Sequence, residues 1–163
     1  MPTATSIPQR SWFNRVWRAF RRQPGHRRAL VMEATLWLAL SRIALLAMPF
    51  RTLAARFGTV SAPGGQAAGK DAPQLTQAQR EAAREVGWAV TRAARHVPFR
   101  AVCLPQAIAA KAMLNRRGIA NVMHFGIDRS SPALRAHAWL DTAGVEVTGF
   151  PLDPGMVEVA RFL

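Results

Sequence analysis

The sequence predicts an α+β fold in which N-terminal helices precede a cysteine-bearing helix packed on a small antiparallel sheet. In the first part of the chain, apolar residues recur at helical spacing. A second helical segment opens at Cys103 and stops at Gly118, and beyond it the apolar residues alternate, which is typical of strands. At 163 residues the chain is long enough for one domain with a substantial core.

The N-terminal third is predicted to form two helices. Between Trp12 and Phe20, apolar residues recur every three or four positions with arginines between them, which predicts a short basic amphipathic helix. Pro24 and Gly25 end it, and a longer helical pattern rich in Ala and Leu runs over residues 28–57.

The second of these helices is not expected to cross a membrane. Residues 34–41 and 43–50 are uncharged, but Arg42 divides them, and neither piece approaches the ~18–20 residues that a span needs. An arginine at the centre of a span costs roughly 2.5 kcal/mol or more. We therefore expect a buried or partner-binding helix and no stable membrane insertion. The apolar stretch also begins too late for a secretory signal, so we expect a cytoplasmic protein.

Positive charge is concentrated at the N-terminus. Residues 1–60 carry ten arginines and one acid, a net charge of +9, whereas residues 61–163 carry +4. Such charge suits nucleic acid, an acidic membrane surface or an acidic protein partner. The sequence shows no RNP, helix-turn-helix or zinc-finger pattern, so we expect no nucleic-acid partner.

A Gly/Pro/Ala-rich stretch divides the chain into a basic helical region (residues 1–60), a linker (61–74) and a core (75–163). In the core, Thr76 is placed to cap a helix that runs to about His96. The last elements expected are three strands, the second and third joined as a hairpin by a three-residue loop, over residues 119–127, 134–141 and 145–150.

The helix that begins at Cys103 has features that would make this cysteine a nucleophile. Pro105 suits a first helical turn, and Gly118 supplies a left-handed stop after Arg116 and Arg117. Cys103 therefore lies at the positive end of a helix dipole, which favours thiolate over thiol. A small buried hydrophobic residue is the alternative reading of a single cysteine.

The same cysteine count excludes other chemistry. One cysteine cannot form an intrachain disulfide, and the four histidines show no metal-ligand spacing, so we expect neither a disulfide scaffold nor a metal site. The Gly-rich stretch at 58–69 lacks a P-loop ending, so the residues imply no organic cofactor.

His137 is the candidate general base, on a strand 34 residues after Cys103. Asp141 lies ~13 Å along the same strand and cannot orient the imidazole. The expected hairpin places Gly149 opposite His137, where a triad would place an acid. The nearest later acid is Asp153, which we take as the substitute third member; a dyad with a backbone carbonyl is the alternative.

Two further residues have competing readings. Trp139, on the face of His137, is a candidate for substrate binding, but a tryptophan on a strand also suits the core. His124 is read as a core or solvated histidine and not as a catalytic one.

Taken together, these segments resemble a known family. They are Cys103-Leu with its Ala-rich helix, the strand ending His124-Phe-Gly-Ile127, then Ala136-His-Ala-Trp139 and Gly144-Val-Glu-Val-Thr-Gly149. They look like the stand-alone leader peptidase of lasso-peptide biosynthesis, whose fold is transglutaminase-like, in the papain-like class, and whose triad is Cys-His-Asp. By this resemblance Cys103 is the nucleophile and His137 the base, while the family's acid falls at Gly149.

The resemblance implies a cytoplasmic cysteine peptidase (a hydrolase) that removes the leader from a ribosomally synthesised and post-translationally modified peptide (RiPP). It implies three partners: the precursor peptide, a separate leader-binding recognition protein, and an ATP-dependent macrolactam synthetase, through which alone ATP would enter. Two alternatives stay open. One is a transglutaminase-like acyltransferase that uses the same pair, and the other is a non-catalytic basic docking protein of a peptide-maturation complex.

Overall fold

The computed structural model describes residues 25–55, 58–61, 74–130 and 135–163. The amphipathic helix expected between Trp12 and Phe20 and most of the expected linker lie outside these residues.

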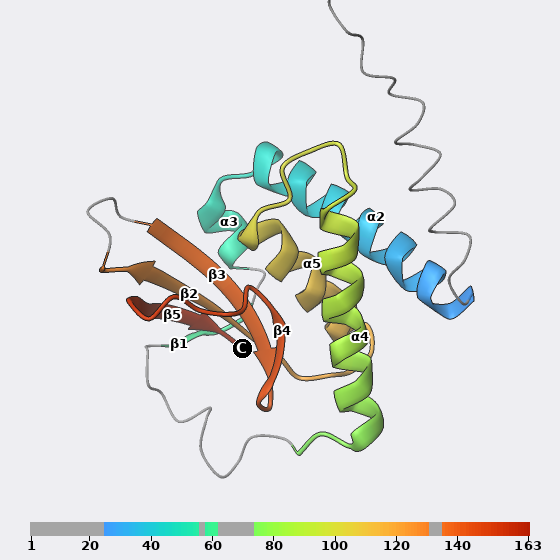
Figure 1. The fold of residues 1–163 in the computed structure, drawn as a ribbon. Helices are drawn as coiled ribbons and strands as arrows, with labels where there is room; N and C mark the ends of the chain where they lie inside the picture. The colour runs from blue at the N-terminus through green and yellow to red at the C-terminus, as the bar shows by residue number, and fades with distance from the viewer. Residues whose placement is uncertain (1–24, 56–57, 62–73, 131–134) are drawn as a thin grey trace, which may run out of the picture.

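A layer of helices packs on one face of an antiparallel sheet (Figure 1). In the described part of the chain the sheet has five strands in the order β1-β5-β2-β3-β4, and every neighbouring pair is antiparallel. The described helices are α2 (Gly25–Ala47), α3 (Phe50–Ala54), α4 (Gln77–Ala94) and α5 (Cys103–Asn115). The strands are β1 (Val60–Ser61), β2 (Val122–Asp128), β3 (Arg135–Thr142), β4 (Val145–Thr148) and β5 (Met156–Phe162). The α+β prediction is confirmed.

Helix α5 lies at the centre of the core. It packs against β3 on one side and against α2 and α4 on the other. Its alanines allow this close approach from several directions because they bring little bulk. Ala107, Ala110 and Leu114 of this helix are fully buried, and Cys103 packs against the same core.

Two local predictions about helix ends are confirmed. Thr76 Oγ1 accepts a hydrogen bond from the backbone N–H of Gln79, and the Gln79 side chain accepts one from the backbone of Thr76, so the pair is a capping box. Gly118 adopts a φ of +63°, and Ile119 N–H donates to Leu114 O at 3.1 Å, which closes α5 with a left-handed stop.

Helix α2 is shorter than predicted. The pattern suggested one helix over 28–57, but α2 ends at Ala47 and Pro49 separates it from α3, because proline cannot continue the helical hydrogen bonding. By length and composition alone, α2 could cross a membrane. In the fold it packs against α4 and α5 and buries Leu30, Ala34 and Leu38.

Two strands were not predicted. Strand β1 is only two residues long and lies at the boundary between the predicted helical region and the predicted linker, where it pairs with β5. Strand β5 lies between β1 and β2 in the sheet. Its Val157 and Val159 are exposed, so its apolar residues do not mark a buried face.

The predicted hairpin exists, but its loop and register differ from the prediction. The turn consists of Ala143 and Gly144, both with positive φ, so that Thr142 pairs with Val145. Asp141 pairs with Glu146 and not with Val145, and the register shifts once more between Leu140 and Asp141.

Candidate active site

Cys103 is the first residue of α5 and is half-buried. Val102 precedes it in extended conformation, and no side chain caps this end of the helix. Gln106 Nε2 donates to Ala101 O at 2.7 Å, which ties the approach segment to the first turn. Pro105 has no N–H, and the N–H of Gln106 donates to Val102 O, so the backbone N–H groups of Cys103 and Leu104 are the ones that can bind an anion beside the sulfur.

His137 is the third residue of β3, and its orientation is set by the backbone of the next strand. Its Nε2 lies 2.7 Å from Gly149 O. Since a carbonyl oxygen can only accept, Nε2 must carry the proton, and the neutral ring then has its lone pair on Nδ1. This is the tautomer in which Nδ1 can take a proton.

An aspartate or glutamate could replace Gly149 only if the backbone shifted. Its φ is +85°, and a Cβ there would come within 2.7 Å of both Ala138 O and Trp139 Cβ. The glycine therefore presents its carbonyl to His137 where a side chain would not fit.

The predicted third member lies elsewhere. Asp153 is exposed in the connection between β4 and β5, and its carbonyl accepts from Met156 N–H at 2.9 Å. Within the described residues its carboxylate forms no hydrogen bond, so it does not contact the His137 imidazole.

The thiol and the imidazole are not joined by a hydrogen bond. Ala138 and Leu140 lie in the core beneath the helices, so strand alternation places His137 on the other face of the sheet. Cys103 has no hydrogen-bond partner among the residues described, although its helix packs directly against β3.

Trp139 is buried between two histidines, with only 6% of its surface exposed. Its ring stacks on His124 with centroids 5.2 Å apart and planes 4° from parallel. On its other side lies His137, 6.1 Å away at 18°. The tryptophan therefore supports the imidazole of His137 and has little surface for a substrate.

A charged cluster beneath Trp139 was missed by the sequence analysis. His124 Nδ1 lies 2.8 Å from Glu158 Oε1, and its Nε2 lies 2.9 Å from Asp141 Oδ2 without the alignment of a hydrogen bond. Arg161 binds the Glu158 carboxylate through two contacts of 2.6 and 2.9 Å. Glu158 and Arg161 belong to β5, a strand that the pattern of apolar residues did not predict.

Burial and charge act in opposite directions on this cluster. Burial alone would lower the pKa of His124, but Asp141 and Glu158 outweigh it and raise that pKa above its ordinary value. Burial would raise the pKa of Glu158, yet Arg161 and His124 lower it overall. The cluster is therefore built to hold a charged histidine, which suits structure better than proton transfer.

Arg117, which follows α5, connects the end of this helix to α2. Arg117 donates to Met113 O at 2.7 Å and to the Glu33 carboxylate of α2 at 2.6 and 3.1 Å. The hydrogen bond from Arg117 is the main cause of the lowered pKa of Glu33. Within the described residues, no group of three or more His, Cys, Asp or Glu side chains could hold a metal ion.

Comparison with known proteins gives one result. The sequence model of the transglutaminase-like superfamily matches residues 44–160, which include α3, α4, α5 and nearly the whole sheet. The comparisons with curated proteins and with solved structures found no match. The superfamily includes cysteine peptidases and acyltransferases and is commonly cysteine-dependent. With a match over most of its length and the fold described above, the chain belongs to the transglutaminase-like superfamily.

Proposed function

We propose that this protein is a cysteine peptidase that removes the leader from a lasso-peptide precursor before macrolactam formation. The observation that carries the proposal is the bond from His137 Nε2 to Gly149 O, because it leaves Nδ1 free to act as a base. Cys103, at the uncapped start of a helix in a transglutaminase-like fold, is the matching nucleophile.

The residues support an acyl-thioester route. His137 Nδ1 takes the proton of the Cys103 thiol, and the sulfur attacks the carbonyl of the last leader residue. The tetrahedral oxyanion is stabilised by the backbone N–H groups of Cys103 and Leu104 at the start of α5. The core peptide's amine then leaves with the proton from His137. A water molecule, deprotonated by His137, hydrolyses the thioester and releases the leader carboxylate.

This route requires the imidazole and the thiol to come within hydrogen-bond reach of each other. In the structure His137 lies on the face of the sheet opposite the helices, so the route also requires a rearrangement that brings its ring to the Cys103 end of α5. The half-buried state of both Cys103 and His137 supports the proposal, because each side chain keeps some access to solvent.

A surface on α2 supports the proposed partners. Met32, Leu36, Leu40, Ile43 and Leu46 form an apolar stripe along one side of the helix, with exposed fractions between 43% and 72%. We propose that the leader-binding protein binds this α2 stripe. The partner's binding surface would be apolar, with acidic residues at its rim. The positive charge of the N-terminal region is the complement of such a rim. The macrolactam synthetase would then act on the released core, and it alone would use ATP.

The experiment uses a lasso-peptide precursor, incubated with the full-length protein and a leader-binding protein. Mass spectrometry should find two fragments whose summed mass exceeds the precursor's by one water, with the break at a single bond. An intact precursor under these conditions, with the proteins shown to be folded, would refute the proposal.

The acyltransferase alternative uses the same residues and differs only in the acceptor. The superfamily itself includes such enzymes, which is the observation in its favour. Adding a small primary amine such as glycinamide separates the two. A leader fragment ending in a free carboxylate supports the peptidase, and a leader fragment joined to the amine supports the acyltransferase.

A further inference from the structure

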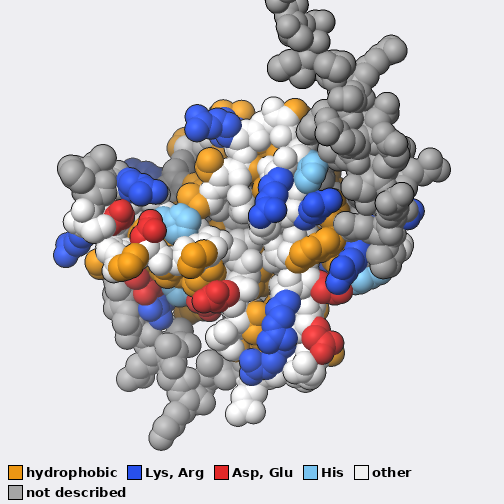
Figure 2. All heavy atoms as spheres, in the orientation of Figure 1, with side chains coloured by type: hydrophobic (Ala, Val, Ile, Leu, Met, Phe, Trp, Pro, Cys, Tyr) orange, Lys and Arg blue, Asp and Glu red, His pale blue; other side chains and the backbone are white. Residues whose placement is uncertain are grey.

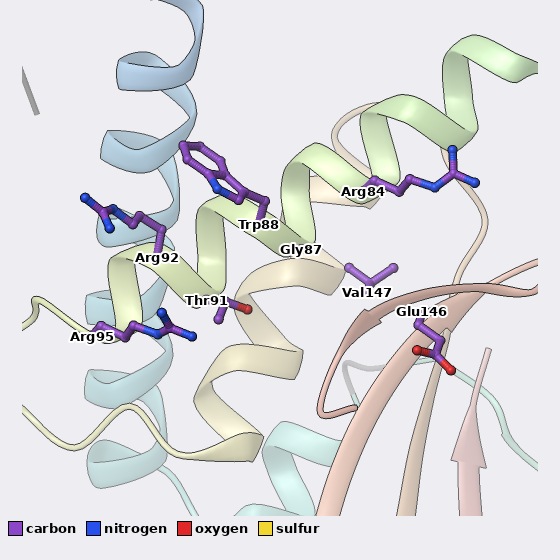
Figure 3. Close-up of a pocket in the computed structure, with 8 residues that line it drawn as sticks. All are labelled: Arg84, Gly87, Trp88, Thr91, Arg92, Arg95, Glu146 and Val147. Atoms are coloured by element: carbon purple, nitrogen blue, oxygen red, sulfur yellow. The ribbon is translucent and has the colours of Figure 1, made fainter. Parts of the chain in front are cut away.

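A groove lies between α4 and the edge strand β4, and neither Cys103 nor His137 lines it (Figure 3). Its volume is about 380 Å³. Helix α4 forms one wall and β4 forms the other. The residues that line it are Arg84, Gly87, Trp88, Thr91, Arg92, Arg95, Glu146 and Val147.

The charge of this groove is unbalanced. Arg84, Arg92 and Arg95 line it, and none of the three forms an ion pair with a described residue. Glu146 is the one acidic residue in the lining. Figure 2 shows Lys and Arg side chains gathered where α4 meets the sheet. Three unpaired guanidinium groups against one carboxylate favour an anionic ligand.

The floor of the groove is formed where helix and strand approach most closely. A Cβ on Gly87 would lie only 2.4 Å from Val147 O, so only glycine allows α4 to pack directly on the backbone of β4. Trp88, on the same helix, adds an aromatic surface, and Arg27 lies 5.0 Å from its ring centroid. The groove thus offers cations along its walls and an indole beside them.

The cations are spaced for an extended chain. Arg84 and Arg95 are eleven residues apart on one helix, which separates their Cα atoms by about 16 Å along its axis. An extended peptide covers that length in about five residues. Two carboxylates about five residues apart on an extended peptide could therefore reach both guanidinium groups.

The strand that forms one wall of the groove also leads to the residue that holds the His137 imidazole. Val147 is two residues from Gly149, the residue whose carbonyl binds His137. Those two residues extend about 7 Å along a strand. The groove is therefore linked to His137 through the backbone of β4, while the imidazole itself lies on the opposite face of the sheet.

We propose that this groove binds an acidic, extended segment of the substrate peptide, with one carboxylate on Arg84 and another on Arg95. This inference rests on the proposed function, because it assigns the groove to the same substrate. It makes the groove a determinant of which precursor is cleaved, while Cys103 and His137 carry the chemistry.

The test measures binding by fluorescence anisotropy with the full-length protein. The probe is a labelled 12-residue Gly/Ser peptide that carries two Glu residues five positions apart. We expect the double variant Arg84→Gln, Arg95→Gln to bind it at least tenfold more weakly than the unmodified protein. The same charge change at two exposed arginines outside the groove, Arg51→Gln with Arg129→Gln, should alter binding less than twofold.

Two further probes decide what the groove recognises. The matched peptide with Gln in place of Glu should bind at least tenfold more weakly; equal binding would overturn the proposal. A 12-nucleotide oligothymidine should not compete at the same concentration. If it competes equally well, and its binding is lost in the same double variant, the groove is a general anion surface and the proposal is wrong.

Cleavage of the precursor separates this inference from the proposed function. The Arg84→Gln, Arg95→Gln variant should raise KM at least tenfold and leave kcat within about twofold. An unchanged KM would overturn the groove proposal while the peptidase stands. Conversely, Cys103→Ala should bind the acidic probe as the unmodified protein does, and loss of that binding would contradict the separation of groove and chemistry.

Discussion

The carbonyl of Gly149 lies 2.7 Å from His137 Nε2, at the place where the family resemblance puts an acid. The carbonyl selects the tautomer and holds the ring, but it brings no full negative charge to stabilise an imidazolium. The bonding therefore corresponds to the dyad alternative, with Trp139 as the second support of the ring.

The first prediction concerns Asp153. Because its carboxylate is exposed and makes no hydrogen bond to a described residue, Asp153→Asn should lower the rate of leader cleavage less than tenfold. Loss of an orienting acid costs about 10⁴-fold in a serine-protease triad. A single-turnover assay measures the rate, and a fall of 100-fold or more would show that Asp153 moves to His137 during the reaction.

The second prediction concerns the pH dependence of stability at His124, which Asp141, Glu158, Arg161 and Trp139 surround. The pKa of His124 is raised, so its contribution is complete below the ordinary value of 6.5 and is lost as pH rises through the folded-state value. The pKa of Glu158 is lowered, so its contribution is complete above 4.5 and is lost as pH falls through the folded-state value.

Thermal unfolding of His124→Gln measures this contribution. The difference in Tm between the unmodified protein and the variant should be largest between pH 4.5 and 6.5 and should shrink at alkaline pH. His26→Gln is the control, because His26 is exposed and pairs only with Glu85 among the described residues. A difference that grows as pH rises above 6.5 would mean that His124 is neutral in the folded protein.

The third prediction concerns the contact between α4 and β4. A Cβ on Gly87 would overlap Val147 O, so Gly87→Ala should destabilise the fold by about 1–3 kcal/mol through the backbone shift it forces. Gly25→Ala is the matched control, since a Cβ there meets nothing within 4 Å and alanine favours a helix. Urea unfolding gives both values, and a Gly87→Ala variant as stable as the control would contradict the close approach.

The fourth prediction concerns the α2 stripe. If it docks a protein, the chain expressed alone should be poorly soluble but not membrane-integral, and co-expression with the leader-binding protein should raise its solubility. Leu36→Gln with Ile43→Gln should raise the solubility of the isolated chain and weaken the complex, because both side chains are mostly exposed. Membrane fractionation decides: a chain that stays in the pellet after high-salt and carbonate washes has an inserted helix.

The helix ends could be predicted from the sequence because the residues that determine them are close together in the chain. Thr76 with Gln79, and Gly118, act within one helical turn, so their roles follow from residue type and spacing. The hairpin register failed because Ala143 adopts a positive φ that alanine rarely takes, which shortens the loop.

The charged cluster around His124 could not be predicted from residue type and spacing. His124 meets Glu158 across the pairing of β2 with β5, and the exposed valines of β5 gave no sign of a strand. A backbone carbonyl was considered only as an alternative, without the residue that supplies it, because residue types do not show which backbone oxygen accepts a hydrogen bond. Contacts between distant segments are fixed by the fold, and neither residue spacing nor composition shows them.

The central claim is that Cys103 and His137 carry the reaction, and the rate of precursor cleavage by Cys103→Ala tests it most directly. The substitution removes little packing at a half-buried helix end, so circular dichroism and Tm should match those of the unmodified protein. We predict that leader release, followed by mass spectrometry under single-turnover conditions, falls below detection, and that His137→Ala behaves in the same way. Undiminished cleavage by folded Cys103→Ala would contradict the account.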